Sequence, residues 1–191
     1  MLNNNPAPHI HPIHELLANR WSPVGFQNKK VEMEKINSLL EAARWAPSSY
    51  NEQPWQYIIG FHGDDTFHKL SDCLTPGNSW AKSAPVLMLS VIKTFFGYNN
   101  KLNRHHLHDT GAASAYMALE ATNQNIAIHQ MEGFSIEKAT QYFNIPENYV
   151  TGSMIAIGYP VEDKNNLPED LKKRDQSPRT RKPFEEMIWK V

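Results

Sequence analysis

The segment Ala46–Trp55, APSSYNEQPW, crowds polar side chains and prolines into ten residues. Ser48, Ser49, Asn51 and Gln53 offer hydrogen-bond donors and acceptors at short spacing. Pro47 and Pro54 restrict the backbone that presents them. Two interpretations fit this pattern: a loop that binds a ligand, or a capped helix followed by a structural turn.

The residues on either side of this segment predict a helix and then a strand. Upstream, Asn28 is predicted to N-cap a helix whose apolar residues follow the helical period and which ends near Pro47. Downstream, Trp55–Phe61 is rich in aromatic and β-branched residues and lies between Pro54 and Gly63, which is typical of a strand. The segment is therefore expected to connect a helix to a sheet.

The rest of the chain alternates helices with two further predicted strands. These strands are Pro85–Ile92, which is nearly continuous in apolar character, and Val150–Gly158. The other predicted helices are His11–Asn19, Asp64–Cys73, His105–Ile126 and a short helix capped by Ser135 that ends near Phe143. The arm Glu162–Ser177 is polar, contains proline and has no apolar core of its own. This order is typical of an α+β or α/β layer.

Length and composition indicate one domain spanning residues 1–191. The chain has 191 residues, of which 40% are hydrophobic and 20% charged, so it can bury a sizeable core. Residues 1–9 are rich in Asn and Pro and are expected to be loose.

Charge and cysteine content narrow the class of partner. A formal net charge of −1 gives no long-range field for nucleic acid or an anionic membrane, so a small-molecule ligand is expected. No run approaches the roughly 18 apolar residues of a membrane helix. Met1–His11 lacks the apolar core of a signal peptide, and the single Cys73 cannot form an intramolecular disulfide. We therefore expect a cytoplasmic protein that binds neither nucleic acid nor membrane.

A second polar stretch, Arg20–Phe26 (RWSPVGF), places a guanidinium and a hydroxyl two residues apart. Arg20 and Ser22 together suit a phosphate group, which accepts charge-assisted hydrogen bonds. An arginine in a surface salt bridge and a serine that caps a helix would give the same pattern. The spacing alone leaves both interpretations open.

Taken together, these stretches resemble the nitroreductase family. Arg20-x-Ser22 followed by Pro47–Trp55 (PSSYNEQPW) carries the resemblance, and the second segment is its specific element. Weaker matches follow in order at Asn78, at Asp109, Gly111 and Ala112, at Glu132-Gly133-Phe134, at Gly158-Tyr159-Pro160 and at Arg181-Lys182-Pro183-Phe184. The matches span nearly the whole chain.

The resemblance implies a fold and an assembly. The fold would be α+β and nitroreductase-like, with a central mixed sheet flanked by helices. The protein would be a homodimer with FMN at the interface between subunits, and the C-terminal arm, residues 162–191, would pack on the partner subunit.

The resemblance also implies two groups of FMN-binding residues. The phosphate and the ribityl chain would lie against Arg20, Trp21, Ser22, Arg179 and Arg181. The flavin ring would be edged from the partner subunit by Ser48, Ser49 and Asn51. Pro47 and Gln53, in the same segment, would also bind the cofactor.

The remaining contacts would surround the flavin ring. Asn78 would bond its pyrimidine end, and the backbone N–H groups of Glu132 and Gly133 would lie near N5 and O4. Lys82 is the candidate cation near N1, where a cation stabilises the reduced ring. The chain departs from some relatives at Val24, where they carry a basic residue, and at Trp21, where many have a smaller polar residue or histidine.

The implied activity is electron transfer from NAD(P)H through flavin N5 to a small acceptor such as a nitro compound or a quinone. Donor and acceptor would use the same place in turn, which gives ping-pong kinetics. The protein would contribute positioning and electrostatics, with no catalytic side chain. The alternative is an FMN-binding protein that stores or senses redox state without significant turnover.

The histidines and aromatics after the second predicted strand are also candidates for function. In the family this region lines the substrate pocket, so the tentative pocket residues are Phe95, Tyr98 and His105. Aromatics that cover a core edge and exposed histidines would explain the pattern as well. The two histidine groups are His9, His11 and His14, and His105, His106 and His108. No cysteine or acidic cluster accompanies them, so no metal site is expected.

Overall fold

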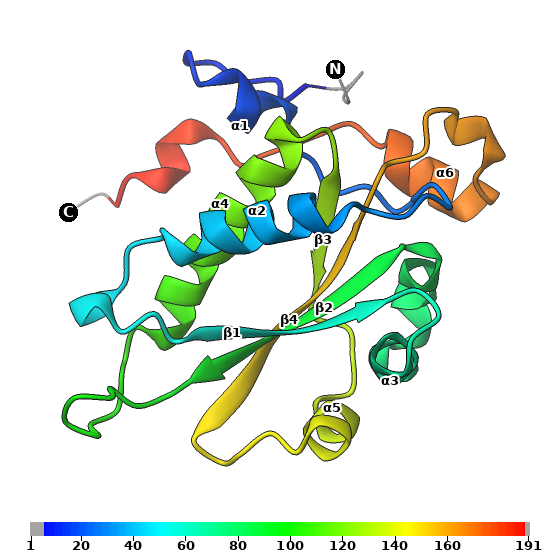
Figure 1. The fold of residues 1–191 in the computed structure, drawn as a ribbon. Helices are drawn as coiled ribbons and strands as arrows, with labels where there is room; N and C mark the ends of the chain where they lie inside the picture. The colour runs from blue at the N-terminus through cyan, green and yellow to red at the C-terminus, as the bar shows by residue number, and fades with distance from the viewer. Residues whose placement is uncertain (1–5, 190–191) are drawn as a thin grey trace.

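The computed structural model describes residues 6–189 and is built around a four-stranded sheet with helices on both faces (Figure 1). The strands are β1 (Trp55–Phe61), β2 (Val86–Lys93), β3 (Ala127–Met131) and β4 (Tyr149–Gly158), in the spatial order β1-β2-β4-β3. The three strands predicted from sequence are confirmed as β1, β2 and β4.

Helices α2 and α4 cover one face of the sheet, and α3 and α5 cover the other (Figure 1). The α-helices are α1 (Glu15–Asn19), α2 (Met33–Arg44), α3 (Asp65–Cys73), α4 (His106–Asn123), α5 (Ile136–Phe143) and α6 (Glu169–Gln176). Short 3-10 helices are η1 (Ser49–Asn51), η2 (Pro76–Ser83), η3 (Lys164–Asn166) and η4 (Phe184–Met187).

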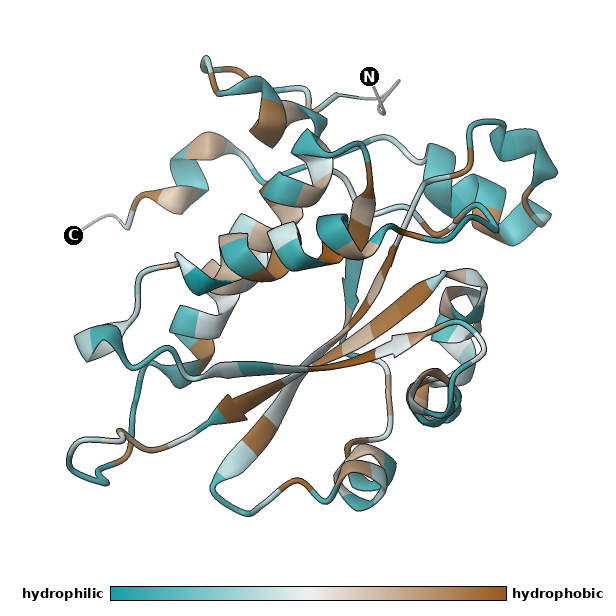
Figure 2. Cartoon of the chain, viewed as in Figure 1, coloured by the Kyte–Doolittle hydropathy of each residue, from teal (hydrophilic) through white to brown (hydrophobic). Residues whose placement is uncertain are grey.

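Strand β2 is apolar throughout because it contributes to two cores at once. Val86 and Met88 pack toward α2 and α4, whereas Leu87 and Leu89 pack toward α3 and α5. Successive side chains of a strand point to opposite faces, so a strand covered on both sides needs apolar residues at every position. Figure 2 shows this as the brown colour of β2.

The prediction of a mixed sheet is wrong, because every pair in the described sheet is antiparallel. The segments that join β1 to β2 and β3 to β4 return the chain to the end of the sheet from which it left. Helix α4 is the connection that crosses the sheet, and it joins β2 to β3. These two strands run in the same direction, but β4 lies between them, so they do not pair.

Three local predictions need correction. Strand β3 was missed because its sequence, AIHQM, is short and its residues His129 and Gln130 break the apolar run. Asn28 does not cap α2, which begins at Met33 after Glu32, and the Glu32 carboxylate accepts a hydrogen bond from Tyr159 Oη instead (2.6 Å). The polar arm Glu162–Ser177 contains η3 and α6, although no local apolar pattern marks them.

The predicted looseness of residues 1–9 falls partly outside the described residues. Of the rest, Ala7 donates its backbone N–H to Ala18 O at 2.8 Å, and His9 donates to Ala7 O at 2.9 Å. The described part of this segment is therefore hydrogen-bonded to the end of α1.

The N-cap of α5 provides a stability test. Ser135 Oγ accepts a hydrogen bond from Lys138 N at 3.2 Å, which satisfies one of the free N–H groups of the first turn. Ser135→Ala is expected to lower the free energy of unfolding by about 1 kcal/mol in urea denaturation. Ser38→Ala, at a half-buried position in the middle of α2 where Oγ donates to Glu34 O of the same helix, is the control and should not destabilise. Equal unfolding midpoints for the Ser135 variant and the wild type would show that this cap contributes nothing.

Candidate functional site

A basic hollow of about 360 Å³, here called the arginine pocket, lies between the segment after α1 and the segment that includes the end of α6. The guanidinium groups that line it belong to Arg20, Arg174, Arg179 and Arg181, and Trp21 and Ser22 line it with them. The structure thus brings together the five residues assigned to the phosphate and the ribityl chain. Arg174 was missed, because nothing in the polar arm distinguishes it from the neighbouring lysines.

Hydrogen bonds between distant segments hold the arginine pocket together. Arg179 Nη1 donates to Ala18 O at 2.8 Å, and Arg179 Nη2 donates to Arg20 O at 2.7 Å. Arg20 Nη1 in turn donates to Ser22 Oγ at 3.2 Å. Arg179 therefore fixes the backbone that carries Arg20.

The arginine pocket carries an excess of positive charge. Burial, and then the charges of Arg179 and Arg181, lower the pKa of Arg20. Burial, and then Arg181, lower the pKa of Arg179. Both arginines stay charged, since guanidinium does not lose its proton in proteins. An anion with several acceptor oxygens, such as a phosphate, would offset both the burial of these cations and the repulsion between them.

Asp175 is the acidic residue among those described in the pocket wall, and its charge is already used. Its side chain is buried, Oδ1 accepts the backbone N–H of Val24 at 3.1 Å, and Oδ2 lies 3.0 Å from Lys164 Nζ. Val24 itself is 4% exposed and packs in the core, so a basic side chain at this position would have to leave the core. Lys164 Nζ also lies 4.3 Å from the centroid of the Trp21 ring.

Asn78 and Gly133 form a second polar group next to the pocket. Gly133 O accepts hydrogen bonds from Thr75 N (3.1 Å), Thr75 Oγ1 (2.9 Å) and Asn78 Nδ2 (3.1 Å). A Cβ atom at Gly133 would lie 2.5 Å from Asn78 Nδ2, so the close approach requires glycine. The structure therefore brings Asn78 and Gly133 into contact, and their separate roles at the flavin ring stay predictions.

Lys82 and Glu132 are both exposed. The pKa of Asp72, on α3, is lowered by hydrogen bonds from Tyr142 and Lys138 and further by the charge of Lys82. Lys82 thus acts on the α3 side of η2, and its role near flavin N1 stays a prediction.

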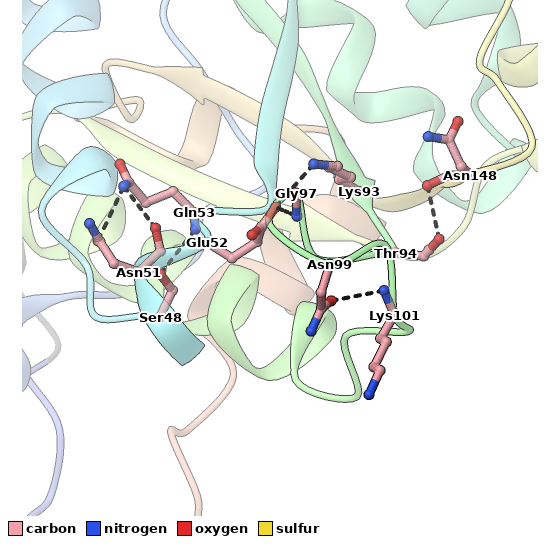
Figure 3. A network of polar contacts seen from close by, with 10 residues as sticks. All are labelled: Ser48, Asn51, Glu52, Gln53, Lys93, Thr94, Gly97, Asn99, Lys101 and Asn148. Carbon is pink, nitrogen blue, oxygen red and sulfur yellow. Dashed lines mark hydrogen bonds and ion pairs between the residues drawn. The ribbon is translucent and has the colours of Figure 1, made fainter.

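The loop Ser48–Gln53 has an unusual backbone. Tyr50, Asn51 and Gln53 have φ angles of 53°, 55° and 49°, a left-handed conformation that residues with a side chain adopt at a cost. Internal hydrogen bonds offset this cost: Gln53 N donates to Ser48 Oγ at 3.0 Å, and Gln53 Nε2 donates to Asn51 Oδ1 at 3.1 Å (Figure 3). Strained backbone of this kind gathers at functional sites.

Glu52, which the sequence analysis did not single out, connects this loop to the loop after β2. Its Oε1 accepts Lys93 Nζ at 3.0 Å and the backbone N–H of Gly97 at 2.8 Å (Figure 3). Beside this link the ring of Tyr50 lies 5.6 Å from those of Phe96 and Tyr98. The two loops are therefore held as one unit.

The three tentative substrate-pocket residues are not equivalent. Tyr98 is exposed and stands beside Tyr50 of the loop. Phe95 is half-buried and its backbone bridges to Leu102. His105 is exposed at the start of α4, with its ring 6.2 Å from that of His108. Tyr98 therefore lies against the Ser48–Gln53 loop, and the pocket role of all three residues stays a prediction.

Asp109 fixes the start of the loop from α4. This carboxylate is 3% exposed, and its Oδ2 accepts the backbone N–H of Ser49 at 2.9 Å. Asp109→Ala is expected to lower the free energy of unfolding by about 1 to 2 kcal/mol, because it leaves that N–H without its acceptor. Urea denaturation measures this. Asp109→Asn keeps an acceptor oxygen and should lose less, and equal losses for both variants would contradict the assignment.

The arginine pocket and the Ser48–Gln53 loop lie apart in the folded chain. The arginine pocket is formed where the C-terminal segment passes α1 and α6, whereas η1 lies beyond the far end of α2 (Figure 1). Among the residues that line the arginine pocket, none comes from positions 47–53. One chain therefore carries two separate parts of the predicted site.

Residues 6–189 carry no candidate for a metal centre or for a membrane-spanning helix. No group of three or more His, Cys, Asp or Glu side chains in this part of the chain is arranged to hold a metal ion. No helix within the same range has the length and apolar character needed to cross a membrane.

Comparisons with known proteins identify a family and a similar fold. A model described as the nitroreductase family matches residues 17–76. A solved structure described as an oxidoreductase containing FMN is 30% identical, with a TM-score of 0.90 over 99% of this chain and 96% of that chain.

Two curated relatives differ in the reactions that their names describe. A protein of Methanothermobacter thermautotrophicus, provisionally named an NADH dehydrogenase/NAD(P)H nitroreductase, is 26% identical over 78% of this chain and 78% of its own length. The iodotyrosine deiodinase 1 of Sus scrofa is 23% identical over 78% of this chain and 62% of its own length. Proteins similar to this chain therefore carry names for different reactions.

Proposed function

This chain belongs to the nitroreductase family, and on that premise we propose that it binds FMN and transfers electrons from NAD(P)H to a small acceptor such as a nitro compound or a quinone. The observation that carries the proposal is the convergence of four arginines on one pocket. The solved relative described as containing FMN supports it, because its similarity extends over nearly the whole chain.

The residues present fit the phosphate end of FMN. Four guanidinium groups surround the pocket, and the one described carboxylate in its wall is paired with Lys164. The indole N–H of Trp21, in the same wall, is buried and has no hydrogen-bond partner. A phosphate accepts several charge-assisted hydrogen bonds at once, so it satisfies this set of donors.

The ring end of FMN would be held by Asn78 and by the backbone at Glu132 and Gly133. Gly133 O already accepts one N–H of Asn78, which orients the amide. The second N–H and the Oδ1 atom of Asn78 are the groups that would bond a pyrimidine-like edge. When bound, FMN supplies the electron transfer, and the chain supplies binding, orientation and electrostatics.

A second copy of the chain would complete each site. The loop Ser48–Gln53 lines no part of the arginine pocket of its own chain, so its polar side chains would reach the pocket of a partner. Large apolar side chains stand exposed along α1, α4 and the C-terminal segment, namely Leu17, Leu107, Tyr116, Phe184 and Trp189. Such surface favours association. We therefore propose a homodimer with two sites, in which the C-terminal arm packs on the partner subunit.

Donor and acceptor would bind at one surface in turn, which gives ping-pong kinetics. The unit formed by Tyr50, Phe96 and Tyr98 would present aromatic rings to a planar ligand at that surface. The family does not fix the acceptor, since a deiodinase is among the relatives.

A visible absorption spectrum of the purified protein, followed by anaerobic titration with NADH and with NADPH, tests the proposal. We expect flavin bands and full bleaching by at least one of the two nucleotides. Protein that stays colourless after incubation with excess FMN would refute flavin binding. Protein that binds FMN but transfers no electrons from either nucleotide to any acceptor would instead be a redox store or sensor.

A further inference from the structure

We propose that Arg174 of α6 binds the flavin phosphate and thereby makes the arginine pocket selective for FMN over unphosphorylated riboflavin. This inference rests on the proposed function. It concerns a residue that no sequence motif marks, on a helix that the sequence did not predict.

Buried polar contacts hold α6 against the segment that carries Arg20 and Ser22. Asp175, the neighbour of Arg174, is 5% exposed and accepts the backbone N–H of Val24. Lys164 joins the same carboxylate and covers the Trp21 ring. A buried carboxylate that is both paired and hydrogen-bonded fixes its helix, because releasing it would leave a buried charge unpaired.

Arg174 is positioned by an aromatic ring and not by a carboxylate. Its guanidinium carbon lies 5.8 Å from the centroid of the Trp80 ring, and its Nη1 lies 3.5 Å from Gly77 O. Within residues 6–189 no carboxylate forms an ion pair with Arg174. A guanidinium that lies over a ring keeps its charge and most of its N–H groups available for a ligand.

Trp80 is in turn held in place by neighbouring rings. Its ring lies 4.6 Å from that of His129, whose Nδ1 is 2.8 Å from Pro23 O, and 6.4 Å from that of Phe26. Pro23 follows Ser22 directly, so this stack ties η2 to the segment that carries Arg20. Arg174 therefore spans the distance between the arginine pocket and η2, where Asn78 lies.

The chemistry that distinguishes the two flavins lies at this end of the site. FMN carries a phosphate with about −1.5 to −2 charges at neutral pH, whereas riboflavin ends in a neutral hydroxyl. A guanidinium forms two parallel hydrogen bonds with a phosphate and has no comparable match to a hydroxyl. Loss of Arg174 should therefore affect FMN and leave riboflavin nearly unchanged.

The test is a binding titration of FMN-free protein with FMN and, separately, with riboflavin, followed by flavin fluorescence. For Arg174→Ala we expect about tenfold weaker FMN binding and riboflavin binding within about twofold of wild type. Lys173→Ala removes the same charge from the adjacent exposed position of α6, which does not line the arginine pocket, and it should leave both affinities within about twofold. Arg174→Lys should recover part of the loss, because it restores the charge without the paired donors.

Three results would overturn the inference. One is an Arg174→Ala protein that binds FMN as tightly as the Lys173→Ala protein. Another is an equal loss of FMN and riboflavin affinity, which would indicate a packing role through Trp80. A wild-type protein that binds no FMN would remove the proposed function and this inference together, whereas tight wild-type binding with an unaffected variant would remove the inference alone. Arg174→Gln, which keeps a long polar side chain, replaces the alanine variant if the latter does not fold.

Discussion

Arg20→Ala is expected to weaken FMN binding by about 1.5 to 3 kcal/mol, or roughly tenfold to over a hundredfold. Arg20 is partly buried among Arg179 and Arg181, and its Nη1 is already oriented by Ser22. A cation held in this way loses little side-chain entropy on binding a phosphate. Titration of FMN-free protein by flavin fluorescence measures the change.

Two further variants separate charge from geometry at this position. Arg20→Lys keeps the charge but not the two parallel donors, so its affinity should lie between those of wild type and Arg20→Ala. Lys69→Ala, an exposed position on α3, is the control for the loss of one positive charge. If the Arg20→Ala protein retains its flavin as well as the Lys69→Ala protein does, Arg20 does not hold the phosphate.

Mixing two inactive variants is expected to restore FMN sites. Arg20 and Asn51 lie in separate parts of one chain, so each site would take Arg20 from one subunit and Asn51 from the other. In a dimer of one Arg20→Ala chain and one Asn51→Ala chain, one site carries both substitutions and the other carries neither. In an equimolar random mixture about a quarter of all sites should bind FMN as wild type does.

The measurement is flavin content after the two differently tagged variants are co-expressed and the mixed dimer is isolated. The matched control pairs Arg20→Ala with Arg179→Ala, whose side chains line the same pocket of one chain, so that mixture contains no intact site. Flavin loss in both mixtures would refute the shared site. A particle with the mass of one chain and full activity would do the same.

Elements whose signals are local were predicted from the sequence. Strand β2 is apolar at nearly every position because both its faces are covered, and Ser135 caps α5 by accepting an N–H three residues away. Strand β3 was missed because its extended form depends on pairing with β4. The N-cap of α2 was placed too early because Glu32, which precedes Met33, engages Tyr159, a residue 127 positions away.

The candidate site divides in the same way. Arg20, Ser22 and the segment Pro47–Trp55 were identified because they resemble motifs of the nitroreductase family. Arg174 and Asp175 were not identified, because Arg174 contacts Trp80 and Asp175 contacts Val24. Asp175 and Val24 are 151 positions apart in the sequence. Glu52 was missed for the same reason, since its partners Lys93 and Gly97 belong to another loop.

The sequence by itself determined the family, an α+β chain and the residue types that suit a phosphate. The tertiary structure decided that the sheet is wholly antiparallel in the described residues, that four arginines line one pocket, and that the loop Ser48–Gln53 lies away from it. The reason is physical: caps and strand patterns depend on neighbours within a few residues. The pocket depends on contacts such as that of Arg179 with Ala18, which exist only after the sheet and both helical layers have packed.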